Sequence, residues 1–491
     1  MDINKKYEQW FNYEGMDASL KAELAGMTEE QKEDAFYKNL EFGTAGMRGI
    51  LGAGTNRMNI YTVRKANMGF AKYVANLPEG KERGVAISYD NRHMSYRFAI
   101  ESAKILAKFG IKSYIMESLR PTPELSFAVR YLKCAGGIMI TASHNPKEYN
   151  GYKVYDDTGC QLIPEWGDIV VDYVNEIDDE LEIEQISDEE AYPFITWVGE
   201  EVDEAYYKAV MGIEINPGLD KSDFKIVYSP QHGADNIPVR TCLKRLGYDI
   251  VPVLAQCAPD PDYTNTKSPN PEVDASYELA IKLAKEVDDV VAITDPDGDR
   301  LGVVAKHNGE YVLMSGNQSA AVYLEYILSQ RKEKGTLPDN AVMYNTIVTS
   351  DLGELVARNY GVDVEKTLTG FKFIGDKIRK YEKTHEKQFI FGYEESYGCV
   401  VEDFVRDKDA VQAVLLAAEC GNYYKKQGKD LIDVLNELYA KYGTFKESQI
   451  ALAKAGAAGA ARIKEMMDTL RQDKPTEIGG VKVVLSEDYA T

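Results

Sequence analysis

The sequence predicts an α/β protein built from three successive strand–helix units. Two features of the sequence predict this class. Short apolar runs of strand length recur along the chain, and between them lie longer segments in which apolar residues return every three or four positions. Strands that alternate with helices in this way form sheets with right-handed crossover connections. The length of 491 residues leaves room for three domains of ~150 residues each.

The first unit follows an amphipathic helical segment over residues 1–40. The apolar pattern predicts helices over 62–77 and 97–109. The expected strands are 84–90, 111–116, 138–140 and 150–154. Arg92 and His93 lie just past the end of a strand, and we expect them to be surface polar residues.

The second and third units repeat this alternation. In the second unit, strands are expected over 225–228, 249–253 and 289–293, with helices over 236–246 and 275–286. Four prolines between 258 and 272 predict an irregular loop there. In the third unit, strands are expected over 341–344, 364–367 and 388–391, with helices over 318–328, 351–359 and 409–425.

The last segment, 446–491, differs from the three units. An Ala/Gly-rich stretch leads into an expected helix within 452–470, and residues 480–485 are expected to form a strand. One helix and one strand cannot bury a core by themselves.

Composition excludes some classes of partner. The formal net charge of −22 argues against nucleic acid and anionic membrane as partners, since both need a basic face. The six cysteines are scattered without a C-x-x-C pair, which predicts buried free thiols in a reducing compartment. We see neither a secretory signal nor a run of 18 apolar residues, so the sequence predicts a cytoplasmic protein.

The stretch 137–146 runs from an apolar strand into hydroxyls, a histidine and an Asn-Pro turn. The polar part falls at the carboxyl end of the strand, where open α/β sheets bind ligands. Ser143, with His144 beside it, is therefore a candidate nucleophile if it is activated or carries phosphate. The alternative is that these hydroxyls only cap a turn.

Asp295, Asp297 and Asp299 stand two apart in the loop after another expected strand. Three carboxylates from one loop suit a small hard cation with oxygen ligands, Mg²⁺ first. A calcium-binding EF-hand does not fit, because Gly298 falls at loop position four rather than six, and Lys306 takes the place of the glutamate at position twelve. A plain acidic turn is the alternative.

Other loops hold candidate ligand groups. Residues 42–49 contain three glycines, whose backbone amides can approach an anion, and Arg48, which can bind an oxyanion. Glu394 and Ser396, at alternate positions, can grip adjacent sugar hydroxyls, and an ordinary polar turn is the alternative. The alternating charges of residues 406–409 are more typical of a solvated surface.

Three of these loops together resemble one family. Thr141-Ala-Ser-His-Asn-Pro146, Asp295-Pro-Asp-Gly-Asp-Arg300 and Gly392-Tyr-Glu-Glu-Ser396 are similar, in the same order, to the phosphoserine, metal and sugar loops of the α-D-phosphohexomutase superfamily, of phosphoglucomutase/phosphomannomutase type. The resemblance implies a mutase that interconverts hexose 1-phosphate and hexose 6-phosphate, with glucose the first choice of sugar. It also implies Mg²⁺, a phosphoserine enzyme and glucose 1,6-bisphosphate as intermediate and activator.

The resemblance also implies roles for single residues. Ser143, Lys408 and Arg48 would be catalytic, and Ser143, Asp295, Asp297 and Asp299 would ligate the metal. Substrate-binding roles would fall to Arg48, His144, Lys153, Arg300, Thr369, Gly370, Lys372, Glu394, Ser396 and Lys408. Lys408 is the first choice for the proton acceptor and donor and Lys372 the second, and that task needs a lowered pKa. For Lys153, a plain surface charge is the alternative.

The fold implied is three mixed α/β sheet domains of related topology around a central cleft, with an incomplete fourth α+β domain. Their expected ranges are 1–211, 212–312, 313–444 and 445–491. We find no Arg-Pro-Ser-Gly-Thr-type loop for the substrate's second phosphate, so we expect weaker binding and turnover. A mannose or pentose phosphate mutase, a non-catalytic sugar-phosphate binder and a metal-dependent phosphatase stay open. The sequence does not predict an oligomeric state.

Overall fold

The computed structural model describes residues 2–43, 46–287, 290–448, 452, 454 and 456–489. The chain divides into two compact units. Unit 1 consists of Met1–Asn39, Ala53–Asn56 and Lys446–Thr491, and unit 2 of Leu40–Gly52 and Arg57–Phe445. All candidate site residues belong to unit 2.

Unit 1 begins with three short helices, α1 (Ile3–Asn12), α2 (Ala18–Gly26) and α3 (Glu29–Phe36). Trp10 and Phe36 are fully buried and meet edge to face, which joins α1 to α3. Thr28 and Gln31 form a capping box that starts α3. The same unit holds the small fourth α+β segment, with α18 (Gly456–Gln472), β16 (Glu477–Ile478) and β17 (Val481–Lys482). Strand β17 is shorter than the expected strand over 480–485, because only two residues pair with β16.

Unit 2 contains three sheets, whose strands are mixed in direction. The first sheet has the order β1-β5-β4-β2-β3-β6, the second β11-β10-β9-β7-β8 and the third β13-β12-β14-β15. The strands of the first sheet are β1 (Gly46–Ile50), β2 (Val85–Tyr89), β3 (Ser113–Met116), β4 (Gly136–Ile140), β5 (Tyr149–Tyr155) and β6 (Ile195–Val198). Those of the second are β7 (Lys225–Ser229), β8 (Asp249–Pro252), β9 (Val290–Thr294), β10 (Leu301–His307) and β11 (Glu310–Met314). Those of the third are β12 (Ala341–Thr346), β13 (Asp363–Thr367), β14 (Gln388–Tyr393) and β15 (Cys399–Val400).

The three sheets share one topology. Each sheet contains the same arrangement of four consecutive strands. The first of these four lies between the second and the third and runs parallel to both, and the fourth pairs antiparallel with the third. This arrangement repeats as β2-β3-β4-β5, β7-β8-β9-β10 and β12-β13-β14-β15. The related topology expected from the sequence is therefore present, although the chain shows no strict sequence repeat.

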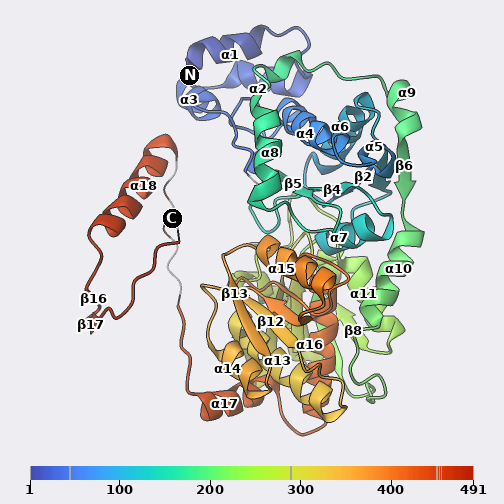
Figure 1. The fold of residues 1–491 in the computed structure, drawn as a ribbon, viewed down its shortest axis with the longest axis vertical. Coiled ribbons are helices and arrows are strands. Elements are labelled where there is room, and N and C mark those ends of the chain that lie inside the picture. The colour runs from blue at the N-terminus through green and yellow to red at the C-terminus, as the bar shows by residue number, and fades with distance from the viewer. Residues whose placement is uncertain are drawn as a thin grey trace. The chain divides into compact units, whose positions relative to one another are not determined.

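Helices cover the sheets of unit 2 (Figure 1). Those of the first sheet region are α4 (Ile60–Ala75), α5 (Gly80–Arg83), α6 (Ser95–Lys108), α7 (Thr122–Tyr131), α8 (Pro164–Asn175), α9 (Asp188–Ala191) and α10 (Glu200–Met211). The remaining ones are α11 (Asn236–Arg245), α12 (Glu278–Val287), α13 (Gly316–Glu333), α14 (Leu352–Asn359), α15 (Phe371–Thr384), α16 (Ala410–Lys425) and α17 (Leu431–Tyr442). Short 3-10 turns lie at Glu180–Glu182, Tyr192–Phe194, Leu254–Gln256 and Asp274–Tyr277.

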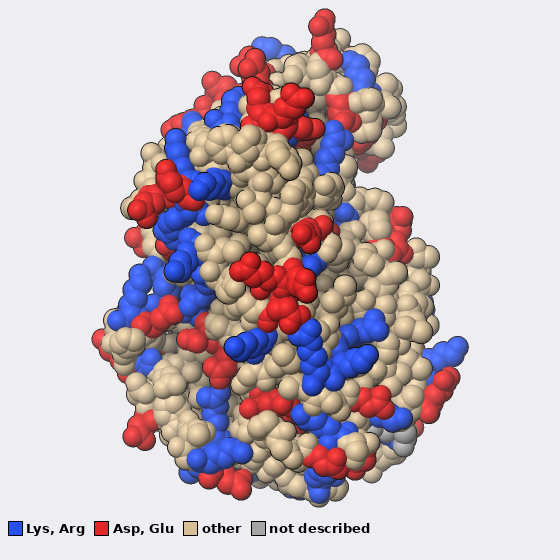
Figure 2. Space-filling view, turned by 90° about the vertical axis from the view of Figure 1, so that its right-hand side faces the viewer, with Lys and Arg blue, Asp and Glu red and all other residues tan. Residues whose placement is uncertain are grey.

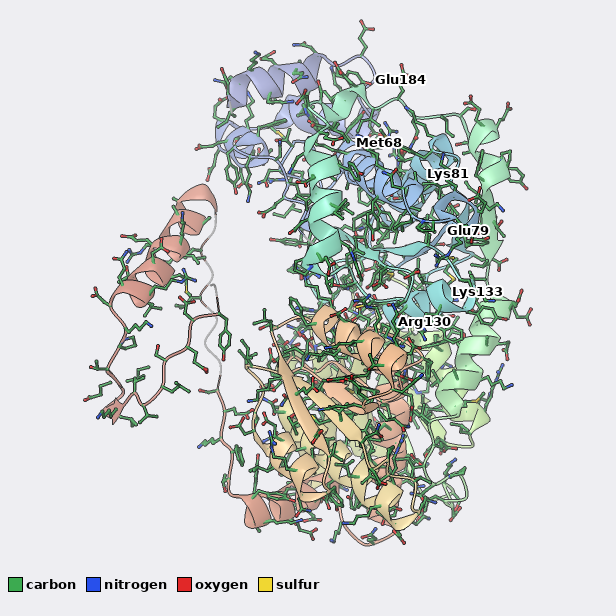
Figure 3. The ribbon with its side chains drawn as sticks, in the orientation of Figure 1. Met68, Glu79, Lys81, Arg130, Lys133 and Glu184 are labelled. Carbon is green, nitrogen blue, oxygen red and sulfur yellow. The ribbon has the colours of Figure 1, made fainter. Side chains whose placement is uncertain are left out.

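Helix α16 joins the second and third sheets. Its residues are buried on nearly all sides, because it packs against β9 and β10 of the second sheet, β15 of the third, and the helices α11 and α13. One hydrophobic core therefore runs through both regions. Between the first and third regions, Arg130 of α7 (labelled in Figure 3) forms an ion pair of 2.8 Å with Glu382 of α15.

The surface and the thiols agree with the composition. In the view of Figure 2, lysine and arginine side chains are interspersed with aspartate and glutamate. All six cysteines are free and buried, as the sequence predicts. None of the helices in the described part of the chain has the length and hydropathy needed to cross a lipid bilayer.

Candidate active site

The three motif loops occupy the same position in the three sheets. The Ser143 loop joins β4 to β5, the Asp295 loop joins β9 to β10, and the Glu394 loop joins β14 to β15. Each loop thus follows the third strand of its sheet and leads into the antiparallel fourth. Carboxyl ends of parallel strands are where open α/β sheets bind ligands, and here the loops of different sheets meet.

Ser143 contacts the acidic loop of the second sheet directly. Its Oγ donates to Asp295 Oδ2 at 2.6 Å and lies 3.1 Å from His144 Nδ1. A hydroxyl has one hydrogen, so when it serves Asp295 the imidazole must present Nδ1–H. Burial, together with the nearby Arg300 and Arg48, lowers the pKa of His144 to about 3, which keeps this imidazole neutral.

Asp295, Asp297 and Asp299 form a buried carboxylate cluster. Each offers one oxygen within 4.8 Å of the others, and all three are at most 3% exposed. The turn is closed by the backbone amides of Asp299 and Arg300, which donate to Asp295 Oδ1. Asp297 Oδ1 and Asp299 Oδ1 have no hydrogen-bond partner among the residues that the structure describes. Buried, unpartnered carboxylate oxygens are the donor set of a hard divalent cation, so these residues fit Mg²⁺.

The charges of the cluster are unevenly balanced. Burial and the neighbouring carboxylates of Asp297 and Asp299 raise the pKa of Asp295 well above its usual range. Burial opposes ionisation of Asp297 too, but the charge of Lys153, together with side-chain hydrogen bonds from Asp295, Lys153 and Thr122, outweighs it and holds that pKa below its usual range. The pKa of Asp299 is also lowered, by Lys408, Lys153 and Arg300 against burial and Asp297.

Two lysines converge on this cluster. Lys153 Nζ lies 2.9 Å from Asp297 Oδ2 and 3.6 Å from Asp299 Oδ2. Lys408 Nζ lies 3.4 Å from Asp299 Oδ2, 3.7 Å from Glu394 Oε2 and 3.6 Å from Asp407 Oδ1. Burial lowers the pKa of Lys408, but these three carboxylates outweigh it and raise the pKa above its usual value. Lys408 is therefore held as an ammonium group in this structure, opposite to the lowered pKa that a base needs.

Further predicted residues make contacts within the loops around the cluster. Glu394 is buried and accepts a hydrogen bond from the backbone amide of Gly370 at 3.0 Å. Arg48 donates to Asn145 Oδ1 in the Ser143 loop at 2.9 Å. Thr44 and Ala45 of the same glycine-rich motif lie outside the described residues. Arg300 pairs with Glu272 at 2.6 Å, and its Nε is 3.8 Å from Asp299.

The residues Thr369, Lys372 and Ser396 are less closely connected. Thr369 is exposed, whereas Lys372 and Ser396 are half-buried. Burial lowers the pKa of Lys372, as a lysine base requires. The structure thus brings together one cluster, which consists of Ser143, the three aspartates, Lys153, Lys408 and Glu394. The remaining predicted residues lie outside this cluster.

Sequence reasoning missed several supporting residues. Thr122 begins α7, and its Oγ1 donates to Asp297 Oδ2 at 3.0 Å. The prediction that Arg92 is a surface residue was wrong, because its side chain is fully buried against the Ser143 loop. The alternating charges of residues 406–409 by themselves favoured a solvated surface, but all four residues, including the predicted site residue Lys408, are buried. The local sequence does not predict the burial of a charged residue when its partners lie in distant parts of the chain.

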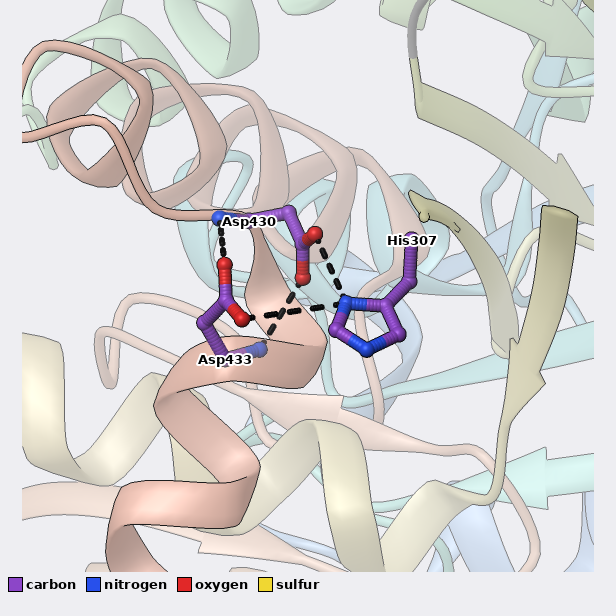
Figure 4. Close-up of side chains that lie close together, drawn as sticks. All are labelled: His307, Asp430 and Asp433. Carbon is purple, nitrogen blue, oxygen red and sulfur yellow. Dashed lines mark hydrogen bonds and ion pairs between the residues drawn. The ribbon is translucent and has the colours of Figure 1, made fainter. Parts of the chain in front are cut away.

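A second cluster joins His307 to the start of α17 (Figure 4). His307 Nδ1 lies 2.9 Å from Asp430 Oδ2 and 3.8 Å from Asp433 Oδ1. The other oxygens of both aspartates are engaged in the capping box of α17. These contacts account for the cluster as a link between β10 and α17.

Comparison with known proteins identifies the family. Sequence models of the phosphoglucomutase/phosphomannomutase α/β/α domains I, II and III match residues 39–181, 204–309 and 315–442. The chain is 37% identical to a phosphoglucomutase of Staphylococcus haemolyticus over 490 residues, which covers 99% of this chain and 87% of that protein. It is 39% identical to a phosphoglucomutase of Staphylococcus epidermidis over 468 residues, covering 94% and 84%. A crystal structure of a phosphoglucomutase/phosphomannomutase family protein from Burkholderia thailandensis has a similar fold, with a TM-score of 0.65, 18% identity and coverage of 89% and 84%.

The fold and the loop cluster are those of an α/β enzyme that binds its ligand at strand ends. The chain belongs to the phosphoglucomutase/phosphomannomutase family. It is accordingly an isomerase that interconverts hexose phosphates.

Proposed function

We propose that Ser143 carries the phosphoryl group that this mutase transfers, and that glucose 1-phosphate and glucose 6-phosphate are its preferred substrates. The observation that supports the first point is the 2.6 Å contact between Ser143 Oγ and Asp295 in the acidic cluster. The similarity to two phosphoglucomutases supports the second.

The reaction consists of two phosphoryl transfers. In the first, the P–O bond to Ser143 breaks and the serine oxygen takes up a proton from an acid, while a P–O bond forms to the free hydroxyl of the hexose monophosphate, whose proton passes to a base. The resulting glucose 1,6-bisphosphate reorients in the site, so that its other phosphate faces Ser143. In the second, Ser143 Oγ loses its proton, bonds to the other phosphorus, and the sugar oxygen leaves with a proton. Added bisphosphate would prime an enzyme that lacks phosphate.

The chain's own residues hold the reacting groups. Asp295, Asp297 and Asp299 would bind Mg²⁺, and this cation would withdraw charge from a phosphate on Ser143. Arg48 and Arg300 would balance further charge on the moving group, and positioning does most of the remaining work. Glu394, Ser396, Thr369 and Gly370 would bind sugar hydroxyls, and His144 and Lys153 would contact phosphate.

Lys408 is the proposed proton donor to the leaving sugar oxygen. Its surroundings favour the ammonium form that donation needs. Lys372, whose pKa is lowered by burial, stays the second candidate for accepting a proton. The six buried free thiols support a reducing compartment, and we propose the cytoplasm.

The test replaces Ser143 with alanine. Mutase turnover from glucose 1-phosphate to glucose 6-phosphate, with Mg²⁺ and bisphosphate, should fall below detection while the melting temperature stays within a few degrees. Ser222→Ala, at an exposed serine of the second region, is the matched control and should keep full activity. Retained turnover in Ser143→Ala would contradict the proposal.

Mannose 1-phosphate and ribose 1-phosphate, assayed in parallel with glucose 1-phosphate, decide which sugar is preferred. Release of free phosphate in the same assays reports phosphatase activity.

A further inference from the structure

The Ser143 loop has a conformation that needs support. Ser143 has a φ of 51°, in the left-handed region that non-glycine residues seldom adopt. Its backbone amide donates to Thr141 Oγ1 at 2.8 Å, and the amide of Asn145 donates to the carbonyl of Ala142 at 3.1 Å. The amide of Tyr149 likewise donates to the carbonyl of Pro146 at 3.0 Å. None of these bonds reaches the carbonyls of Ser143 and Asn145, which need donors from elsewhere.

Arg92 supplies those donors. Its Nη2 donates to the carbonyl of Ser143 at 2.5 Å and to that of Asn145 at 2.6 Å. Its Nη1 donates to the carbonyls of Pro146 at 2.8 Å and Tyr149 at 3.0 Å. One guanidinium therefore binds four carbonyls along the loop. The planar fork of arginine can bridge acceptors in this way, whereas the single nitrogen of lysine cannot.

The sheet brings Arg92 to this place. Strands β2 and β4 are parallel neighbours, and Tyr89 pairs with Ile140 at their carboxyl ends. The residues that follow β2 must then lie beside those that follow β4. Asp90 is fixed there by its backbone amide, which donates to the carbonyl of Ile140 at 3.1 Å.

Arg92 is itself held rigidly. Asp90 Oδ1 accepts from the backbone amide of Arg92 at 2.9 Å and from Ser95 Oγ at 2.7 Å. Asp90 Oδ2 lies 3.3 Å from Arg92 Nε, and neither of these two side chains is exposed. From the second region, the ring of Tyr263 lies 5.4 Å from the guanidinium carbon. The arginine is thus clamped between a carboxylate, a ring and the loop.

We propose that Arg92 is a positioning residue for phosphoryl transfer. By binding the carbonyl of Ser143 and those after it, Arg92 holds the left-handed backbone that aims Ser143 Oγ at Asp295. It makes no contact with Ser143 Oγ in the described structure, so it acts through the loop rather than on the reacting atoms. This inference rests on the proposed role of Ser143 and adds the device that sets its direction.

Arg92→Lys is the test, with Arg83→Lys as the matched control. Arg83 also donates to loop carbonyls, those of Lys133 and Cys134, but at the amino ends of β2 and β4, the opposite edge of the sheet. We expect Arg92→Lys to lower kcat by about 100-fold, since misplacement of a reacting group by ~1 Å costs that much. KM for glucose 1-phosphate should change by less than about threefold, because the sugar-binding loop is untouched. Arg83→Lys should leave both constants unchanged.

A second variant separates positioning from folding. Arg92→Ala should lose still more activity, and guanidinium chloride at low millimolar concentration should restore part of its kcat without a matching change in melting temperature. If Arg92→Ala does not fold, the kcat and KM values of Arg92→Lys decide alone. The inference is overturned if Arg92→Lys keeps kcat within threefold of the parent, raises only KM, or loses no more activity than Arg83→Lys.

The two proposals fail in different ways. Turnover by Ser143→Ala would overturn the proposed function and this inference together. An inactive Ser143→Ala with a fully active Arg92→Lys would overturn this inference alone.

Discussion

Two of the three clustered aspartates, Asp297 and Asp299, hold a buried carboxylate oxygen without a hydrogen-bond partner in the described part of the chain. Unpaired buried acceptors cost free energy, and mutual repulsion adds to that cost. A divalent cation removes both costs. The cost is clearest at Asp295, because burial and the neighbouring carboxylates raise its pKa and so disfavour its ionised form.

Asp295→Asn tests this balance. The amide keeps the shape and cannot ionise, so it avoids the repulsion that an ionised carboxylate meets here. Without added metal the variant should therefore be as stable as the parent or more stable. Mg²⁺ at 100 times its Kd should stabilise the parent by about 2.7 kcal/mol, and the variant by much less at the same concentration. Thermal unfolding with and without Mg²⁺ measures both.

Asp430→Asn is the matched control for the metal experiment. It neutralises a carboxylate in the His307 cluster, where asparagine can still cap α17. Its shift with Mg²⁺ should equal that of the parent. An equal shift in Asp295→Asn would contradict the assignment of the metal to the Asp295 loop.

Asp409 gives a prediction on pH. Burial raises the pKa of its carboxyl to about 6, although hydrogen bonds from α16 amides, Tyr206 and Gln412 oppose the shift. Because the folded pKa exceeds the usual 3.8, the folded protein binds the proton more tightly. Its contribution to stability is complete below pH ~4 and is lost as the pH rises through about 6.

Asp409→Asn should remove the loss of stability that the Asp409 carboxyl causes as the pH rises. Relative to the parent, the free energy of unfolding of the variant should improve by roughly 3 kcal/mol between pH 4 and pH 7, which is the energy of about two pKa units. Urea unfolding at both values measures it. A stability difference that does not change with pH would show that Asp409 has no raised pKa.

Single residues also mark where sequence reasoning stopped. Ser143 and the aspartates could be predicted, because their motifs and strand-end positions lie in the local sequence. Arg92 could not, since its burial depends on the pairing of β2 with β4 and on a tyrosine from another region. Thr122 meets Asp297 only because the first and second sheets approach each other.

Among elements, strand β5 carries a close backbone approach near the site. It lies between β1 and β4, and Gly151 faces the carbonyls of Thr141 and Met47. A Cβ there would lie 2.4 Å from the first carbonyl oxygen and 3.0 Å from the second. Backbone cannot move aside as a side chain tip can, so this position requires glycine.

Gly151→Ala should therefore disturb the Ser143 loop through its neighbour Thr141. We expect a loss of stability on the order of 2 kcal/mol and a large fall in kcat. Gly218→Ala is the control, because nothing lies within 4 Å of its Cβ position and it should cost less than about 0.5 kcal/mol. Urea midpoints and turnover measured for both variants check this, and an active, stable Gly151→Ala would contradict the strand packing.

The strands and helices of unit 2 were largely predictable, since apolar periodicity decides them. Helix α16 illustrates the limit. Its apolar sequence predicts a buried helix, but not that it joins the cores of the second and third sheets. The strand expected over 480–485 was too long, because only Val481 and Lys482 pair with β16, and Val484 is 94% exposed.

At the scale of the whole molecule, one supersecondary pattern is used three times, and its third-strand loops hold Ser143, the three aspartates and Glu394, for which we propose phosphate, metal and sugar roles. The domain limits at 211, 312 and 444 remain a prediction. A triplicated sheet explains why three distant motifs meet: each occupies the same connection in its own sheet. Spacing in the sequence contains no sign of that meeting.

The thiols test the fold as a whole. All six cysteines are free and buried, and burial raises the pKa of Cys134 and Cys399 to about 12. A thiol reagent should therefore react slowly with the native protein and rapidly with six groups after unfolding. Fewer than six groups in denaturant would reveal a disulfide, and rapid reaction of several in the native state would contradict the core packing.

The most direct measurement of the central claim is the location of the transferred phosphate. The protein is incubated with glucose 1,6-bisphosphate labelled with ³²P, quenched and cleaved, and the labelled peptide is sequenced. We predict one label, on Ser143, that is lost when unlabelled glucose 1-phosphate is added. Label on another residue, or full mutase turnover with no labelled serine, would contradict the account.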